Sequence, residues 1–270
     1  MIARAREFAP AKLNLALHVR GKLPDGRHAI ETIFAFCTDG DLLSFEDRGD
    51  GLMTVETEGP FAADIGADNL VTAAWDAMKG EVPLKAGGRF VLEKNLPVAA
   101  GLGGGSADAA AALRLITGVY SLDPAIAMEV APRLGSDVPA CLVSLPMRGD
   151  GGGEVLAPVD LRDMSGTPVL LVNPRVALST AEVFALWDGE DRGPLADWRD
   201  GTNDLERPAV SLVPQIGTVL AWLGTRPGAQ FARMSGSGAT CFAFFENEGA
   251  RDAAADAVPR EWWRLPTYLR

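Results

Sequence analysis

A run of glycines between residues 97 and 113 has the composition of a phosphate-binding loop. The run reads P-V-A-A-G-L-G-G-G-S-A-D-A-A-A-A-L, with glycine at four of the five positions before Ser106. Glycine has no Cβ and tolerates positive φ, so several backbone N–H groups can approach an anion. The alanines that follow favour a helix, whose first N–H groups add positive potential. The segment predicts a phosphate site, although a glycine turn before a tightly packed helix has the same composition.

Two familiar phosphate-binding loops are excluded by the spacing. A P-loop requires G-x-x-x-x-G-K-[ST], and this chain has no lysine or arginine between Lys94 and Arg114. A dinucleotide-binding loop requires G-x-G-x-x-G, and the sixth residue counted from Gly101 is Ser106. This is therefore a third kind of loop, and its composition leaves the reaction open.

The segments beside the loop have the patterns of regular elements. Residues 89–93 are typical of a short strand leading into the loop, and we expect the helix after the loop to end near Gly118. An earlier helix is predicted over residues 69–78, with Asp68 or Asn69 as its N-cap. A strand, a glycine loop and a helix in this order are the context that phosphate binding requires.

Polar side chains also occur at regular positions near the N-terminus. Apolar and polar residues alternate from residue 7 to residue 19, and the polar positions include Lys12, Asn14 and His18. This period of two predicts a half-buried strand, whose polar face, taken alone, is an ordinary solvated one. Asp137 stands two residues before a proline, where an aspartate most simply serves as the N-cap of a helix.

The composition of the whole chain limits its class. Its 270 residues are 47% hydrophobic and 23% charged, as in a globular protein with a real core. A net charge of −11 argues against nucleic acid or an anionic membrane as a partner, because both repel an acidic surface. Three cysteines lie far apart in apolar sequence, which predicts buried reduced thiols. With no apolar leader at the N-terminus, we expect a cytoplasmic protein.

Three segments together match, in order, the three motifs of the GHMP small-molecule kinases. They are P-A-K-L-N-L from Pro10 with D-G-R-H from Asp25, the glycine segment from Pro97 to Ala110, and M-S-G-S-G-A from Met234. Shorter matches are D-N-L-V from Asp68, L-G-S-D-V-P from Leu134, S-T-A-E-V-F from Ser179 and N-D-L-E from Asn203. The chain most resembles the branch of the family whose acceptor carries a cytidine diphosphate group and which serves isoprenoid precursor biosynthesis.

The resemblance implies an α+β fold with two domains and an active site in the cleft between them. We expect an ATP-binding domain over residues 1–157 and a substrate-side domain over residues 158–270. The mixed strand and helix patterns agree with this fold class. The glycine-rich residues 149–153 have the composition of a linker, which predicts a domain boundary or a hinge near residues 149–158.

The resemblance also implies roles for individual residues. Lys12 and Asp137 form the implied catalytic pair, beside the γ-phosphate and the acceptor hydroxyl. The implied ATP-binding residues are Asn69 and Lys94 near the adenine, together with Pro97, Ala100, Gly101, Leu102, Gly103, Gly104, Gly105 and Ser106. The implied substrate-binding residues are Asn14, Arg27, His28, Thr180, Phe184, Gly236, Ser237 and Gly238. Many relatives have an aromatic residue in place of Arg27, whose planar guanidinium can also stack on a base.

ATP and Mg²⁺ are the implied cofactors, and a small molecule carrying a cytidine diphosphate group is the implied partner of a monomer or homodimer. No metal ligand is identified from the sequence. Two alternatives stay open. Another GHMP kinase, acting on homoserine, mevalonate or a sugar, would share the glycine loop but lack D-G-x-H and S-T-A-E-V-F. A catalytically silent nucleotide-binding protein would be expected to have lost Lys12 or Asp137, and both are present.

Overall fold

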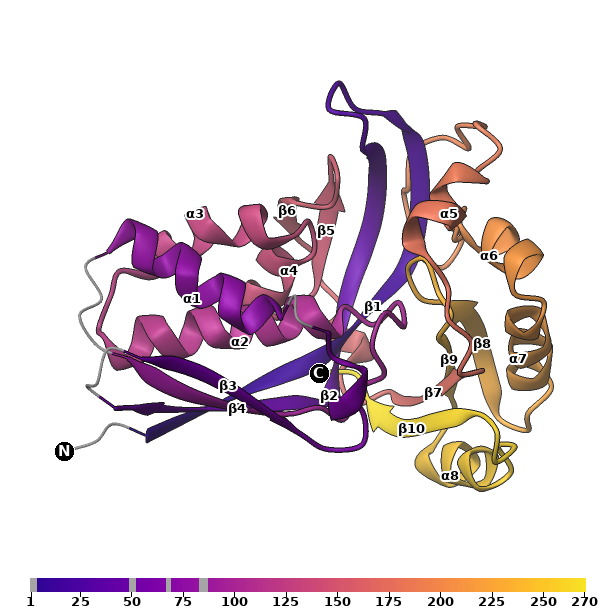
Figure 1. Ribbon diagram of the computed structural model, residues 1–270. Coiled ribbons are helices and arrows are strands. Elements are labelled where there is room, and N and C mark those ends of the chain that lie inside the picture. Colours follow the sequence, from indigo (N-terminus) through magenta and orange to yellow (C-terminus); the bar gives the residue numbers. More distant parts are fainter. Residues whose placement is uncertain (1–3, 49–51, 67–68, 83–86) are drawn as a thin grey trace. The chain divides into compact units, whose positions relative to one another are not determined.

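The computed structural model describes residues 4–48, 52–66, 69–82 and 87–270 (Figure 1). Contacts within it divide the chain into two compact units, each assembled from separate stretches of sequence. Unit 1 consists of Met1–Ala11, Gly40–Val98 and Gly103–Ser144, and unit 2 consists of Lys12–Asp39, Ala99–Leu102 and Leu145–Arg270.

Two long strands contribute residues to both units. Strand β1 spans Arg4–Lys22 and pairs with β2, which spans His28–Asp47. The strand predicted at residues 7–19 is confirmed within β1, but the prediction that its polar face is solvated was wrong. Residues 9–19 are buried on both faces, and Lys12, Asn14 and His18 are buried with them. Because both strands serve both units, the compact units do not coincide with one division of the chain at residue 157. The division into an ATP-binding part over 1–157 and a substrate-side part over 158–270 stays a prediction.

Unit 1 packs helices against strands. Strand β2 pairs antiparallel with β4 (Gly88–Glu93), and β4 pairs parallel with β3 (Met53–Glu58). Helices α1 and α2 lie over these strands (Figure 1). The ring centroid of Phe45 on β2 lies 4.6 Å from that of Phe90 on β4 and 5.9 Å from that of Trp75 on α1, so aromatic contacts join sheet and helix. The helices of unit 1 are α1 (Leu70–Glu81), α2 (Gly104–Val119), α3 (Pro124–Leu134) and α4 (Val138–Val143), with the short 3₁₀ helix η1 at Ala62–Asp64.

The predicted helix boundaries in unit 1 agree with the structure within three residues, and α1 ends at Glu81 rather than at residue 78. The side chain of Asn69 accepts a hydrogen bond from the N–H of Val71, so Asn69 is the N-cap of α1. Asp68, the alternative cap, lies outside the described residues. Helix α2 ends at Val119, one residue beyond the expected Gly118.

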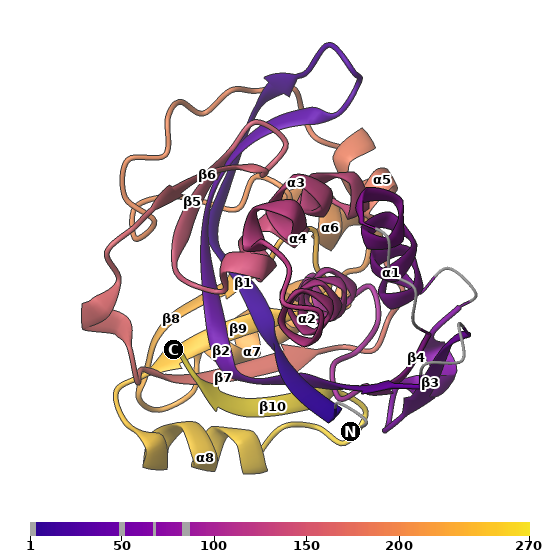
Figure 2. The same cartoon turned by 90° about the vertical axis from the view of Figure 1, so that its left-hand side faces the viewer.

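Unit 2 is built on a four-stranded antiparallel sheet in the order β10-β7-β9-β8. Its strands are β7 (Pro168–Asn173), β8 (Ala229–Met234), β9 (Cys241–Phe245) and β10 (Trp263–Tyr268), and its helices are α5 (Thr180–Ala185), α6 (Glu206–Leu212), α7 (Gln215–Gly224) and α8 (Glu248–Asp256), with the 3₁₀ helix η2 at Arg162–Met164. Helix α8 runs beside β10 (Figure 2). Leu17 and Val19 of β1 and Ile30 of β2 join the core that the sheet forms with α6, α7 and α8.

The glycine-rich residues 149–153 are part of a β-hairpin in unit 2, so the prediction of a linker there was wrong. Strand β5 (Met147–Asp150) pairs antiparallel with β6 (Val155–Pro158), and Gly151 and Gly153 adopt φ of 70° and 109° in the turn between them. A Cβ on Gly149 would lie 2.5 Å from the ring of Phe34 on β2. The glycines therefore permit a tight turn and close packing rather than a hinge.

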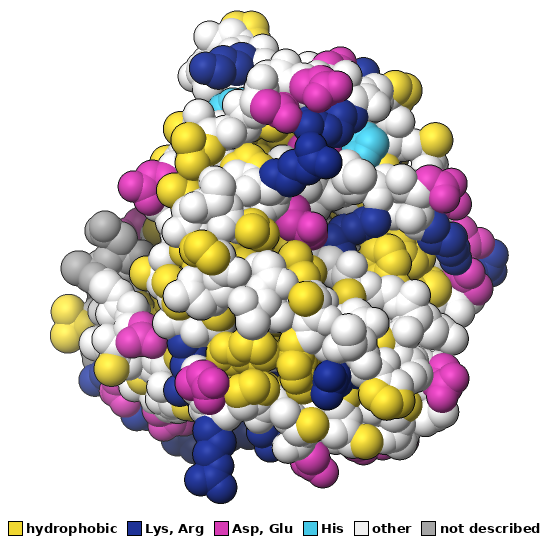
Figure 3. Space-filling model, turned by 90° about the vertical axis from the view of Figure 1, so that its right-hand side faces the viewer, with side chains coloured by type: hydrophobic (Ala, Val, Ile, Leu, Met, Phe, Trp, Pro, Cys, Tyr) yellow, Lys and Arg dark blue, Asp and Glu magenta, His cyan; other side chains and the backbone are white. Residues whose placement is uncertain are grey.

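The predicted state of the cysteines is confirmed. Cys37, Cys141 and Cys241 are buried free thiols, and burial raises the pKa of Cys37 and of Cys241 above the ordinary value. On the face shown in Figure 3, acidic and basic side chains are interspersed. Among the described residues, the helices are too short or too polar for a membrane span.

Candidate active site

The glycine loop ends at a partly exposed helix N-terminus in unit 1. Gly103 has φ 62° and occupies the N-cap position of α2, and the first turn of this helix contains no acidic residue. The N–H of Ala107 bonds to the carbonyl of Gly103 at 2.8 Å, which closes that first turn. Gly104, Gly105 and Ser106 follow the cap and present their N–H groups without a side-chain cap. An anion is the natural ligand of this end.

The preceding residues, Ala99–Leu102, belong to unit 2 and are held there by the third motif. The hydroxyl of Ser235 donates to the carbonyl of Gly101 at 2.8 Å, and the N–H of Thr240 donates to the carbonyl of Ala100 at 3.1 Å. Gly101 has φ 76°, and a Cβ there would lie 2.4 Å from the carbonyl oxygen of Ser235. Any larger residue at position 101 would therefore separate the two segments.

Strand β1 meets the same segment. The N–H of Lys12 donates to the carbonyl of Leu102 at 2.9 Å, and the N–H of Asn14 donates to the hydroxyl of Ser235 at 3.1 Å. Unit 2 thus brings together residues from all three predicted motifs. Pro97 lies in unit 1, where it is half-buried.

Asn203 fixes the third motif and was not predicted as a site residue. Its side-chain amide donates to the carbonyls of Met234 and Gly236 at 2.8 and 2.7 Å, and its own oxygen accepts from the N–H of Leu205. Gly236 and Gly238 in this loop have φ of 58° and 88°. Asn203 lies in the N-D-L-E match, but the sequence did not indicate which residues its side chain contacts.

A buried hydrogen-bonded chain orients Lys12. Its ammonium donates to the side-chain oxygen of Asn14 at 2.7 Å, the amide of Asn14 donates to the hydroxyl of Thr32 at 2.8 Å, and Thr32 donates to the carbonyl of Ala16 at 2.6 Å. Lys12 is 3% exposed, and its ammonium lies 5.5 Å from the ring centroid of Phe34. Thr32 therefore determines which end of the Asn14 amide faces Lys12, a role that sequence analysis missed.

We expect Thr32→Val to lower kcat/KM about threefold to tenfold, because the Asn14 amide loses its acceptor and is no longer held toward Lys12. Thr32→Ser keeps the hydroxyl and should restore most of the activity. Steady-state kinetics on both variants test this. Near-normal activity in Thr32→Val would remove the hydroxyl from this role, and a loss in Thr32→Ser as large as that in Thr32→Val would show that the hydroxyl alone does not account for the effect.

Aromatic side chains gather at the start of β2. The ring of His28 stacks on that of Phe184, with centroids 4.7 Å apart and planes inclined by 23°, and Trp187 approaches the edge of His28 at 5.8 Å. Burial, aided by Lys22, lowers the pKa of His28, so the imidazole is neutral near pH 7. The hydroxyls of Thr180 and Ser237 lie 2.8 Å apart, which ties α5 to the third motif.

Arg27 lies in the turn between β1 and β2 and is held by two carboxylates. Its guanidinium donates to Asp25 at 2.8 Å and to Glu154 at 3.2 Å, and its side chain is half exposed. These two ion pairs hold the guanidinium of Arg27, the residue that directly precedes His28 in the sequence. Trp187 is the aromatic neighbour of His28 that sequence analysis did not select.

Lys94 lies under the glycine loop in unit 1 rather than in an open pocket. Its ammonium is 2.6 Å from a carboxylate oxygen of Asp41 and 2.6 Å from one of Asp108, and all three side chains are buried. Burial lowers the pKa of Lys94, but the two carboxylates outweigh this effect and leave it raised. The proposed contact of Lys94 with adenine stays a prediction, and the described contacts give its ammonium a role in supporting the loop.

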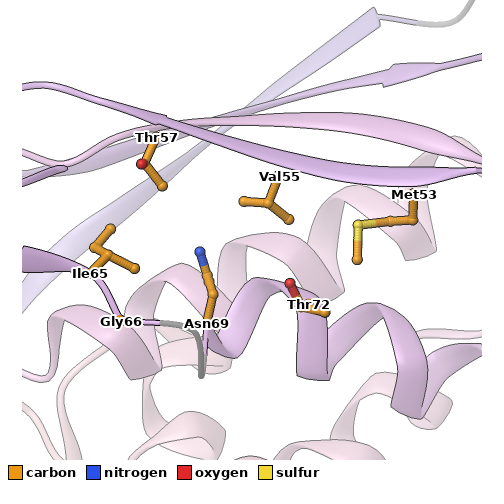
Figure 4. A pocket seen from close by; sticks show the side chains of 7 residues that line it. All are labelled: Met53, Val55, Thr57, Ile65, Gly66, Asn69 and Thr72. Atoms are coloured by element: carbon orange, nitrogen blue, oxygen red, sulfur yellow. The ribbon is translucent and has the colours of Figure 1, made fainter. Parts of the chain in front are cut away.

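A pocket of about 320 Å³ opens between β3 and the start of α1 in unit 1 (Figure 4). Its floor is formed by Asn69, whose amide nitrogen points toward the pocket while its oxygen caps α1. The other lining residues are Met53, Val55, Thr57, Ile65, Gly66 and Thr72. The walls combine apolar side chains with the hydroxyls of Thr57 and Thr72, and together with the Asn69 amide they suit a flat heterocycle that carries polar atoms.

Asp137 stands at the N-cap position of α4, but its side chain makes no cap hydrogen bond. The simplest reading from the sequence, an ordinary N-cap, is therefore not what the structure shows. A Cβ on Gly135, two residues earlier, would lie 4.0 Å from the hydroxyl of Ser106 at the start of α2. Within unit 1, the segment that carries Asp137 thus adjoins the N-terminal end of the glycine-loop helix.

Comparison with known proteins identifies the family. The model for the GHMP kinases N terminal domain matches residues 69–144, and the model for the GHMP kinases C terminal matches residues 188–265. A protein from Rhizorhabdus wittichii, named 4-diphosphocytidyl-2-C-methyl-D-erythritol kinase, is 50% identical over 98% of this chain and 94% of its own length. The chain belongs to the GHMP kinases. A protein of the same name from Novosphingobium aromaticivorans is 49% identical to this GHMP kinase, over 98% of this chain and 93% of its own.

Solved structures agree with the assignment. A crystal structure of 4-(cytidine 5'-diphospho)-2C-methyl-D-erythritol kinase superposes with a TM-score of 0.82 at 30% identity, covering 98% of this kinase and 99% of that chain. The Methanococcus jannaschii mevalonate kinase superposes with a TM-score of 0.73 at 10% identity, over 100% and 99% of the two chains, which shows a shared fold. The expected α+β GHMP kinase fold and the ATP-dependent kinase class are thereby confirmed.

Proposed function

We propose that this GHMP kinase transfers the γ-phosphoryl group of ATP to the 2-hydroxyl of 4-diphosphocytidyl-2-C-methyl-D-erythritol. The products are the 2-phosphate and ADP, in the non-mevalonate route to isoprenoid precursors. One observation carries the proposal: two proteins named for this activity match 98% of the chain at 50% and 49% identity. Kinases of mevalonate and homoserine share the fold at only 10–15% identity.

The catalytic step assigns one role to each of two residues. The acceptor oxygen forms a bond to the γ-phosphorus while the bond from that phosphorus to the bridging oxygen breaks, and ADP leaves with the electron pair. Asp137, whose carboxylate does not cap α4, takes the proton of the acceptor hydroxyl. Lys12, oriented through Asn14, stabilises negative charge on the transferred group. Positioning and charge stabilisation supply most of the rate in such reactions.

Binding is divided among the groups described above. The N–H groups of Gly103–Ser106 at the start of α2 hold phosphate oxygens, with the segment Pro97–Leu102 preceding them. The pocket above Asn69 receives the adenine. His28 and Phe184 provide flat surfaces for cytosine, while Arg27, Asn14, Thr180 and the Gly236–Gly238 loop contact the rest of the acceptor. A neutral His28 can stack and also hydrogen-bond to a base.

Mg²⁺ is proposed as the metal cofactor. Mg²⁺ in kinases is held largely by nucleotide phosphate oxygens and water, with one or two protein ligands. The described residues contain no group of three or more His, Cys, Asp or Glu side chains arranged for a metal. The residues present therefore suit a metal that arrives with ATP rather than a permanent protein-bound ion. When bound, it would neutralise charge on the phosphate oxygens.

An ADP-release assay with ATP and Mg²⁺ tests the proposed function. The acceptor 4-diphosphocytidyl-2-C-methyl-D-erythritol is compared with homoserine, mevalonate and galactose at equal concentrations. We expect turnover only with the cytidine diphosphate compound. Turnover with another acceptor would instead assign a different GHMP kinase activity. ATP binding without turnover on any acceptor would indicate a catalytically silent protein.

A further inference from the structure

The buried cluster of Asp41, Lys94 and Asp108 contains two carboxyl groups and only one ammonium group. Each carboxyl group places an Oδ2 atom 2.6 Å from the Lys94 nitrogen, so the two groups adjoin each other. The three side chains are 0–5% exposed. With every group in its ordinary charge state, the cluster would bury one net negative charge in unit 1, at a large cost in free energy.

This cluster lies directly beneath the first residue of α2. A Cβ built on Gly104 would lie 3.0 Å from the Lys94 nitrogen and 3.6 Å from Oδ2 of Asp41. A net negative charge at this depth would oppose the positive potential of the helix N-terminus and would repel a phosphate group above it. The charge of the cluster is therefore coupled to anion binding at the loop.

The hydrogen bonds indicate which carboxyl group holds a proton. Oδ1 of Asp41 accepts from the N–H groups of Asn95 and Leu96 at 2.6 and 2.8 Å, in addition to the bond from Lys94 to its Oδ2. Three hydrogen-bond donors therefore surround the carboxyl group of Asp41. Oδ1 of Asp108 is buried and has no hydrogen-bond partner in the described part of the chain. Burial raises the pKa of Asp108 to about 7, with Asp41 adding to the rise and Lys94 opposing it.

The helices around Asp108 carry other charged groups, most of them exposed or paired. Helix α4 has no charged residue between its ends at Val138 and Val143. Arg114, on α2 itself, is paired with Glu7, and Asp137 precedes α4. The charged side chains of α1 and α3 are exposed to solvent; they are Asp76, Lys79, Glu81, Glu129 and Arg133.

We propose that Asp108 is protonated when the nucleotide binds, that its proton keeps the cluster neutral beneath the loop, and that loss of this proton to solvent weakens ATP binding. The inference rests on the proposed function in one respect, since it takes ATP as the ligand of the loop. Asp108 acts here as a positioning residue, through Lys94 and the start of α2.

The dissociation constant of ATP, measured from about pH 6 to about pH 9, tests the coupling. For the wild-type protein we expect it to rise about threefold to tenfold more than for Asp108→Asn, which is neutral at every pH. The phosphate groups of ATP change protonation identically in both experiments, so any difference in pH dependence between wild type and Asp108→Asn arises from the protein. Asp76→Asn removes an exposed aspartate from unit 1 and should behave as wild type. Equal pH dependence in wild type and Asp108→Asn would overturn the coupling.

Infrared difference spectra of the free protein test the proton itself, independently of any kinase activity. We expect the absorption of a protonated carboxyl group at neutral pH, which fades as the pH is raised, is absent in Asp108→Asn and persists in Asp76→Asn. A wild-type spectrum without this absorption would overturn the protonation of Asp108. If both tests succeed while no acceptor is phosphorylated, the proposed function alone has failed.

Discussion

Asp137→Asn should lower kcat about 10²- to 10⁴-fold while leaving the dissociation constant of ATP nearly unchanged, because an amide cannot accept the proton of the acceptor hydroxyl. The expected loss is large because a positioned general base typically contributes about 10²- to 10⁴-fold to the rate. Single-turnover kinetics with saturating ATP measure the chemical step, and calorimetric titration measures ATP binding.

The matched control for this variant is Asp123→Asn. Asp123 is the N-cap of the neighbouring helix α3, where its side chain accepts from the N–H of Ala125 at 2.9 Å. Asparagine caps helices as well as aspartate, so this variant should keep full activity and stability. Near-normal turnover in Asp137→Asn would remove Asp137 from the role of base. Loss of ATP binding in parallel with turnover would assign it to the nucleotide site instead.

Lys94→Met should lower the free energy of unfolding by about 3–5 kcal/mol, because it leaves the carboxylate of Asp41 buried without its counterion. Without the ammonium, which opposes the rise, burial raises the pKa of Asp108 further above its value in the unfolded chain. The folded state then binds more protons than the unfolded state, so the stability of the variant falls as the pH rises. Urea unfolding followed at about pH 5 and about pH 8 should therefore show the larger deficit at the higher pH.

Lys79→Met is the control for the loss of a positive charge. Lys79 is exposed on α1 in the same unit, and its replacement should change stability by less than about 0.5 kcal/mol. A deficit in Lys94→Met as small as that of Lys79→Met would show that the cluster contributes little to the fold. A deficit independent of pH would show that lost packing of the lysine chain, rather than uncompensated charge, destabilises the variant.

Features that depend on neighbouring residues were predictable from the sequence. Asn69 caps α1 because a short polar side chain at that position reaches an N–H two residues ahead, and this depends on local geometry alone. The strand around Lys12 follows from periodicity, and the helix after the glycine loop follows from the helix propensity of its alanines. The roles of Lys12 and Asp137 came from the family resemblance, and they remain predictions.

Features that depend on distant residues were not predictable. Lys94 pairs with Asp41, which lies 53 positions earlier, and no local pattern indicates that pairing. Thr32 and Asn203 acquire their roles only when β2 reaches β1 and when the third motif folds back. Residues 149–153 show a different error: glycine composition alone does not distinguish a flexible linker from a hairpin turn with positive φ.

The division of β1 and β2 between two units has a consequence for the order in which the protein can fold during synthesis. All segments of unit 1 have been translated once Ser144 is complete, whereas unit 2 combines Lys12–Asp39 with residues up to Arg270. Leu17, Val19 and Ile30 therefore leave the ribosome more than a hundred residues ahead of the strands and helices that cover them. Until those elements arrive, this apolar stretch lacks the residues that cover it, and we expect chaperones to bind the nascent chain there.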